Sequence, residues 1–226
     1  MKTLLSILLL LPLVGLAQSS AKLNKVISKL NTVKDYSVDV EVKADIPMIK
    51  ILPSKAKVYF KQKDKFKVVS KGIVILPKQG FSEINTFLSD KSKYMAIEGD
   101  TSKIAGVVVQ LITVIPSGED NEIILAKLWV DDSRSLIIKT QITTKSNGTV
   151  TTNYTYGDMA KFALPSKMVF EIDVKKFKLP KSVAADINQR STEKKDDKRT
   201  KGSITVNLSN YKVNTGLSDE LFKKKS

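Results

Sequence analysis

An alternation of apolar and polar residues is the feature that most restricts the fold of this chain. Between residues 37 and 46, apolar side chains alternate with serine or charged residues. The apolar positions are Val38, Val40, Val42, Ala44 and Ile46. Successive side chains of a β-strand point to opposite faces, so this segment predicts a strand with one apolar and one charged face.

Similar segments recur along the chain, separated by residues that favour turns. The strongest hairpin signal is Asn147-Gly148, which lies between two alternating runs. About ten strands are predicted by this period, joined mostly by hairpins and therefore antiparallel. Apolar or alternating runs occupy residues 37–46, 55–61, 66–68, 73–76, 94–97, 106–115, 122–130, 136–144, 149–156, 168–174 and 203–211.

Two short helices are predicted beside these strands. The first covers residues 21–32, whose apolar residues recur with helical spacing, and the second covers residues 81–88. Two helices are too few to cover a flat sheet of this size, so the sheet is expected to curve around them. The predicted fold class is mainly β (α+β). It consists of one strongly curved antiparallel sheet, a half-barrel, with both helices on its concave side.

The first 17 residues predict a secretory signal peptide. A positive start at Lys2 precedes an apolar run over residues 4–16, and Gly15-Leu16-Ala17 supplies the small residues that a signal peptidase reads. The run is shorter than the roughly 20 apolar residues that span a bilayer. We therefore expect an exported, soluble protein of the bacterial periplasm, in which residues 18–226 form a single monomeric domain that does not span a membrane.

The chain contains no cysteine and no histidine. This excludes a Ser-His-Asp triad, a Cys-His pair, a disulfide and a zinc site built from His or Cys. Glycine-rich phosphate loops and serine-nucleophile motifs do not occur. Asp131 and Asp132 are adjacent, so on a strand they would point apart and are not expected to share a site. We predict a protein that is not an enzyme, with no catalytic residue, metal site or cofactor.

Four stretches of the chain form a recognisable series. The first is the N-terminal helix running into residues 36–46, and the second is the hairpin of residues 58–66, whose turn precedes an aromatic residue. The third is the turn of residues 88–94, before an aromatic strand. The fourth joins Leu128-Trp129-Val130-Asp131-Asp132, the Asn147-Gly148 hairpin and Ala163-Leu164-Pro165. In this order they resemble the periplasmic outer-membrane lipoprotein carriers and their lipoprotein-sorting relatives, and residues 71–87 and 175–201 resemble insertions, as expected of a divergent member.

This resemblance implies a half-barrel that holds a lipid, or the acyl chains of a lipoprotein, without catalysis. It also implies receptor proteins in the inner or outer membrane. Burial of the acyl chains would supply about 25 cal/mol per Å² of apolar surface. The expected lining is Val38, Val40, Val42, Val58, Phe60, Phe66 and Val68, with Phe81, Ile84, Phe87 and Leu88 from the lid helix. The alternative is that these residues form an ordinary core.

Gln62 stands where these carriers have an arginine whose hydrogen bonds hold the helical lid shut, and Lys63 stands where a proline follows. Glutamine donates hydrogen bonds but lacks the charged fork of arginine. The resemblance therefore makes Gln62 the candidate lid-gating residue, and the substitution calls the family's gating into question.

A basic surface provides an alternative function. The chain carries 38 Lys and Arg against 23 Asp and Glu, a net charge of +15. Residues 175–201 are rich in basic residues and poor in apolar ones, which predicts a solvated loop. This loop would bind a polyanion: lipopolysaccharide, an acidic glycan or an anionic membrane surface. Nucleic acid is not expected as a partner after export. The candidate binding residues are Lys175, Lys176, Lys178, Lys181, Lys194, Lys195, Lys198 and Arg199.

Overall fold

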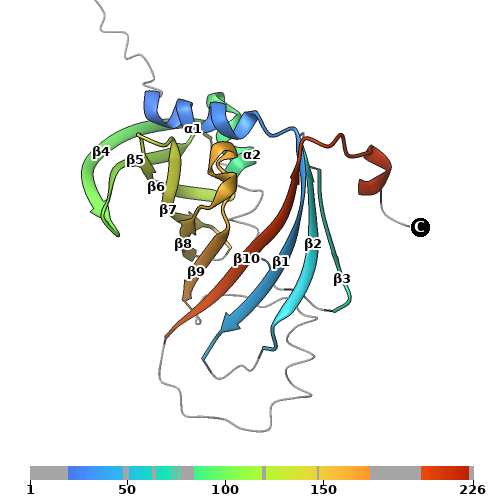
Figure 1. Cartoon of the computed structure of the whole chain (residues 1–226). Helices are drawn as coiled ribbons and strands as arrows, with labels where there is room; N and C mark the ends of the chain where they lie inside the picture. The colour runs from blue at the N-terminus through green and yellow to red at the C-terminus, as the bar shows by residue number, and fades with distance from the viewer. Residues whose placement is uncertain are drawn as a thin grey trace, which may run out of the picture.

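The computed structural model describes residues 20–47, 51–62, 65–72, 74, 76, 84–118, 121–146, 148–173 and 200–223. Within these residues, ten strands form one antiparallel sheet that curves around two helices (Figure 1). The predicted fold class is confirmed. The strands are β1 (Asp35–Asp45), β2 (Ser54–Lys61), β3 (Lys65–Ser70), β4 (Tyr94–Ile104), β5 (Val107–Pro116), β6 (Ile123–Asp131), β7 (Leu136–Thr144), β8 (Gly148–Thr155), β9 (Lys167–Asp173) and β10 (Lys201–Val213).

The strand order shows where the sheet is open. It runs β3-β2-β1-β10-β9-β8-β7-β6-β5-β4. Neighbouring strands follow one another in the chain except for β1 and β10, which come from opposite ends of the chain and pair inside the sheet, as its third and fourth strands. The two edges are β3 and β4, although these strands are consecutive in the chain. The open side of the half-barrel therefore lies between them.

The pairing register gives the sheet one continuous apolar face. Residues directly opposite one another on antiparallel strands share a face. Val58 lies opposite both Val38 and Val68, and Val206 lies opposite both Val42 and Met168. The same face continues through Ile142, opposite Val150 and Ala126, to Val114 and Ala96.

Both helices pack against this face, which makes it the concave one (Figure 1). Helix α1 (Ala21–Asn31) begins at Ser20, whose hydroxyl accepts a hydrogen bond from the Leu23 amide. Its apolar residues Leu23, Val26 and Ile27 are buried in one cluster with β4, β5 and β6. Helix α2 (Ile84–Ser89) adds Phe87 and Leu88 to this cluster. No helix among the described residues is long and apolar enough to cross a membrane.

The C-terminal segment returns to the beginning of β1. The buried carboxylate of Asp35 accepts hydrogen bonds from the amides of Thr215 (2.9 Å) and Gly216 (3.0 Å). Asn214 accepts one from the Lys34 amide and donates one to the Thr32 carbonyl oxygen. These bonds connect the segments that follow α1 and β10, so they brace the central β1–β10 pair.

Two segments differ from the sequence prediction. Strand β4 extends to Ile104, whereas alternation predicted only residues 94–97. Its second half is polar on both faces and contains a bulge between Glu98 and Thr101, so period two is lost although the backbone stays paired with β5. Within the predicted run 73–76, Val74 and Leu76 are irregular and pack against the core.

Candidate functional site

The concave face carries two adjacent apolar clusters. The helix-side cluster joins α1 and α2 to β4, β5, β6 and β7. The strand-side cluster joins β1, β2, β8, β9 and β10. Tyr154 of β8 contacts both clusters, so the apolar surface is continuous across the sheet. The buried carboxylates Asp35 and Asp131 lie at the ends of β1 and β6, away from the middle of this surface.

The structure divides the predicted lining between the two clusters. The seven strand residues share the concave face of β1, β2 and β3, and all but Val68 belong to the strand-side cluster or pack against it. Phe87 and Leu88 lie in the helix-side cluster instead. Phe81 and the side chain of Ile84 lie outside the described residues.

Exposure of the predicted lining rises toward the free edge at β3. Val38, Val40, Val42 and Val58 are buried, and Phe60 and Phe66 are half-buried. Val68 is 38% exposed. An apolar ligand that enters from the open side would therefore meet β3 first, since the β1 residues are already covered.

The sequence prediction missed the part of this face that β9 and β10 supply. Met168, Phe170 and Ile172 alternate along β9, and Ile204, Val206 and Leu208 alternate along β10. Period two was visible in both strands. The missing information was the β1–β10 pairing, which places them beside the predicted lining.

Tyrosines contribute to the concave face as neutral groups. Tyr36 stacks on Phe60 with ring centroids 5.1 Å apart and meets Tyr211 edge to face. Burial raises the pKa of Tyr36, and burial raises the pKa of Tyr154 to about 12. Tyr211 donates a hydrogen bond to the Pro165 carbonyl oxygen. These phenols are uncharged at neutral pH and therefore add no charge to the concave face.

Gln62 is bonded to the chain at the end of α1. Its side-chain amide donates hydrogen bonds to the carbonyl oxygens of Asn31 (2.9 Å) and Val33 (3.0 Å), and its backbone amide donates to Lys34 (2.8 Å). Glutamine therefore holds the α1–β1 connection with two neutral donors. This is the geometry on which a gating role for Gln62 depends.

Three lysines on one side of α1 attach the helix to the rim of the sheet. Lys22 forms an ion pair with Glu98 (3.0 Å), and Lys25 forms one with Asp132 (2.9 Å). Lys29 donates a hydrogen bond to the carbonyl oxygen of Arg134. Hydrogen bonds from Ser20 and Lys22 hold the pKa of Glu98 below its usual value. Most of these contacts are exposed, and exposed ion pairs contribute only about 0–1 kcal/mol each.

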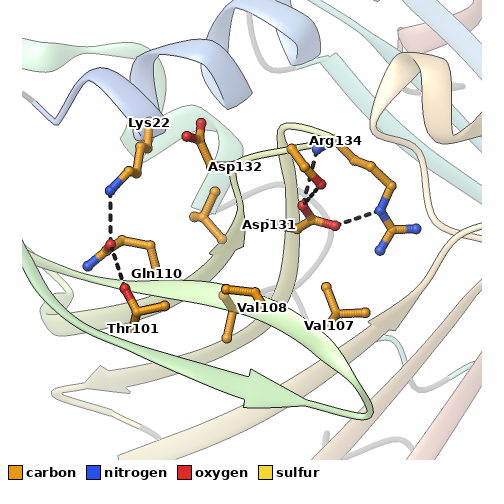
Figure 2. Close-up of a pocket in the computed structure, with 11 residues that line it drawn as sticks. Lys22, Thr101, Val107, Val108, Gln110, Asp131, Asp132 and Arg134 are labelled. Atoms are coloured by element: carbon orange, nitrogen blue, oxygen red, sulfur yellow. Dashed lines mark hydrogen bonds and ion pairs between the residues drawn. The ribbon is translucent and has the colours of Figure 1, made fainter.

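A groove of about 630 Å³ lies between the start of α1, the β4–β5 hairpin and the β6–β7 turn (Figure 2). Asp131 and Asp132 both line it. Asp131 ends β6 and Asp132 lies in the turn that follows, so strand alternation stops between them. The lining residues are Lys22, Thr101, Val107, Val108, Val109, Gln110, Val130, Asp131, Asp132, Ser133 and Arg134.

The carboxylates of this groove are used for structure. Asp131 is buried and accepts hydrogen bonds from the Arg134 amide and from Arg134 Nε (2.6 Å). Burial raises the pKa of Asp131, but the hydrogen bonds from Ser133 and Arg134 outweigh it and leave the pKa below its usual value. Asp132 pairs with Lys25. Asp131 therefore stabilises the β6–β7 turn, and Asp132 anchors α1. The two carboxylates are not positioned for joint acid–base chemistry.

The basic residues proposed to bind polyanions lie outside the described residues. These are Lys175, Lys176, Lys178, Lys181, Lys194, Lys195, Lys198 and Arg199. Strands β9 and β10 on either side of residues 174–199 pair with each other, so this segment connects one hairpin. The polyanion function stays a prediction from the sequence.

Comparison with solved structures finds proteins that share this fold. A DUF1329-family protein from Desulfovibrio piger superposes with a TM-score of 0.59 at 13% identity, over 90% of this chain and 96% of that one. A LolA-superfamily protein from Nitrosomonas europaea gives 0.58 at 13% identity, over 91% and 99%. A putative outer-membrane lipoprotein-sorting protein domain from Vibrio parahaemolyticus gives 0.55 at 13% identity, over 88% and 95%.

These likenesses extend over nearly the whole length of each chain. No family model and no curated protein matches the sequence. At this identity the likenesses concern the fold, and at that level the resemblance predicted from the sequence is confirmed. The chain shares the half-barrel fold of these three proteins.

Proposed function

We propose that this protein is a non-catalytic carrier that holds a lipid, or the acyl chains of a lipoprotein, against its concave face. The observation that supports this function most directly is the continuous apolar face across ten strands, covered by two short helices. An apolar face of this extent binds by excluding water, and it needs no directional contact with the ligand. The predicted signal peptide supports export to the bacterial periplasm, and the resemblance to lipoprotein carriers supports receptor proteins in the inner or outer membrane as partners.

Helix α1 is the part of the cover that must move. Its apolar side is buried on the sheet, so displacing it exposes the helix-side cluster to an incoming acyl chain. The polar bonds that hold it run along one side, from Ser20 and Lys22 at the start, through Lys25 and Lys29, to the Asn31 carbonyl oxygen at the end, and most of them are exposed. An acyl chain would replace the apolar contacts that α1 loses, which keeps the cost of opening low.

Two adjacent residues of β3 test where the ligand enters. Val68 faces the concave side and Val69 faces the convex side, and they are 38% and 47% exposed. Val68→Asp is expected to weaken binding of a fluorescent fatty acid by about tenfold or more, because a charge must then be desolvated beside the acyl chain. Val69→Asp introduces the same charge on the same strand and is expected to leave binding unchanged.

The binding constants come from a fluorescence titration, and circular dichroism confirms that both variants are folded. Organic extraction of the wild-type protein purified from membranes is expected to release lipid. The proposed function is wrong if extraction yields no lipid and the wild-type protein shows no saturable binding. Equal weakening by both variants would instead mean that β3 is not the entrance.

Gln62 tests the gating of α1. Gln62→Ala removes two hydrogen bonds, each contributing about 0.5–1.5 kcal/mol, and is expected to speed hydrogen exchange of the α1 amides and lipid uptake together. Gln62→Arg restores donors and is expected to return both rates toward those of the wild type. Gln62→Glu has no donor at neutral pH and should behave like alanine. A gating role is excluded if exchange in α1 quickens in the alanine variant while the uptake rate stays constant.

A further inference from the structure

The convex face of the sheet changes character from one half to the other. On β1 and β2 it is charged, with Asp39 opposite Lys57 and Glu41 opposite Lys55. On β4, β5 and β6 the register brings apolar residues together instead. Met95 lies opposite Ile115, Ile97 lies beside Thr113, and Leu111 lies opposite Trp129. We name this the convex apolar surface; its residues are Met95, Ile97, Leu111, Ile115, Leu125 and Trp129.

Three of these six side chains are exposed to solvent, and Leu111, Leu125 and Trp129 are half-buried. Met95 is 48% exposed, Ile97 is 47% exposed and Ile115 is 38% exposed. Strand β5 is apolar on both of its faces, a composition that is typical of strands covered on both sides. Its concave side is covered by the helices, and its convex side has no cover among the described residues. Contiguous exposed apolar surface of this kind marks an interaction site.

Lysines accompany the apolar residues. Lys127 lies opposite Thr113, within the convex apolar surface, and Lys139 lies opposite Trp129 with its ammonium 4.9 Å from the ring centre. The six named residues, Thr113 and Lys127 include no acidic side chain. The whole chain carries a net charge of +15. Aliphatic residues, an interfacial tryptophan and lysines together are typical of surfaces that lie on anionic membranes.

We propose that the convex apolar surface of β4, β5 and β6 docks on an anionic lipid bilayer. Met95, Ile97 and Ile115 enter the boundary between headgroups and acyl chains, and Lys127 and Lys139 reach the lipid phosphates. Strand β4 borders the open side of the half-barrel, so docking there brings the opening next to the membrane (Figure 1). This surface includes no residue of the concave face and none of residues 175–201, and the inference does not rest on the proposed carrier function.

The only tryptophan of the chain reports directly on this docking. Trp129 lies on the convex face of β6, so its fluorescence senses the membrane without a label. The probe is a vesicle of equal parts phosphatidylglycerol and phosphatidylcholine, with brominated acyl chains in a second preparation. We expect a blue shift of Trp129 emission with the plain vesicles and quenching with the brominated ones. Vesicles of phosphatidylcholine alone are expected to give much smaller changes, because they lack the negative surface potential.

Substitutions identify the surface that docks. The combined variant Met95→Thr, Ile97→Thr and Ile115→Thr keeps residues that suit a strand, and we expect it to lower the partition coefficient by about tenfold or more. The matched control is Val69→Thr, an equally exposed apolar residue on the convex face at the other edge. The control is expected to partition like the wild type.

Other outcomes overturn the proposal. Docking is wrong if Trp129 is not quenched, or if the triple variant binds the anionic vesicles as tightly as the wild type. If the wild-type protein is a dimer that does not bind vesicles, and the triple variant is a monomer, the surface joins two copies of the chain instead. Val68→Asp separates the two functions, because it should lose fatty-acid binding and retain Trp129 quenching.

Discussion

Replacing Phe170 with alanine is expected to lower the free energy of unfolding by about 3–5 kcal/mol. Phe170 lies in the middle of β9, is fully buried, and faces Thr152 of β8 and Ile204 of β10. Its removal leaves a void in the concave face next to β10, the strand that pairs with β1. Urea denaturation followed by circular dichroism measures the loss.

Val169 provides the matched control for this prediction. It is the preceding residue on the same strand, points to the convex face and is half-buried. Val169→Ala is expected to cost about 1 kcal/mol or less, because water already reaches the site and no void forms. If both substitutions lower the free energy of unfolding by the same small amount, Phe170 is loosely packed and already lies beside a cavity.

The sequence predicted the strands well wherever one face is buried and the other is wet. In β1 and β2 every second residue is apolar. These side chains point to the concave face and pack in the strand-side cluster, which neither helix joins. The Asn147-Gly148 hairpin was predicted from its turn residues, and β7 and β8 pair across it. The signal weakens in the second half of β4, where a bulge lies between Glu98 and Thr101 and residues 101–104 pair with β5 without alternation.

Long-range pairing was not predictable from local patterns. Strands β1 and β10 are separated by more than 150 residues, and alternation states only that each has an apolar face. The amides of Thr215 and Gly216 donate the hydrogen bonds to Asp35 that secure the pair. These isolated residues form no sequence motif. The convex apolar surface was equally hidden, because the apolar run of β5 indicates burial on both faces and cannot show that one stays open.

The candidate site was predictable only in part, because alternation assigns side chains to a face but does not place the elements relative to one another. It assigned the predicted lining residues of β1, β2 and β3 to one face. It could not show that Phe87 and Leu88 pack in a different cluster from those strands. That division depends on where α2 lies over the sheet. The groove at Asp131 was missed because its parts come from a helix start, a hairpin and a turn.

Joining α1 covalently to the rim is expected to abolish lipid uptake, if α1 opens as proposed. The chain has no cysteine, so two introduced thiols react without competition. Lys25→Cys and Asp132→Cys replace an exposed ion pair between α1 and the β6–β7 turn, at a cost of about 0–1 kcal/mol. A short cleavable bifunctional thiol reagent then fixes the helix. Fluorescent fatty-acid uptake should fall by about tenfold or more, because a lid that cannot open denies access to the site.

The decisive comparison is with a crosslink that fixes no lid. Asp39→Cys and Lys57→Cys replace the ion pair between β1 and β2 on the convex face, where no helix is attached. This crosslinked variant is expected to take up fatty acid like the wild type. Cleaving the reagent in the α1 variant should restore uptake, which distinguishes closure of the lid from damage to the fold. Uptake that continues unchanged with α1 fixed would show that the ligand enters at the β3 edge while α1 stays closed, and that the helix-side cluster is permanent core.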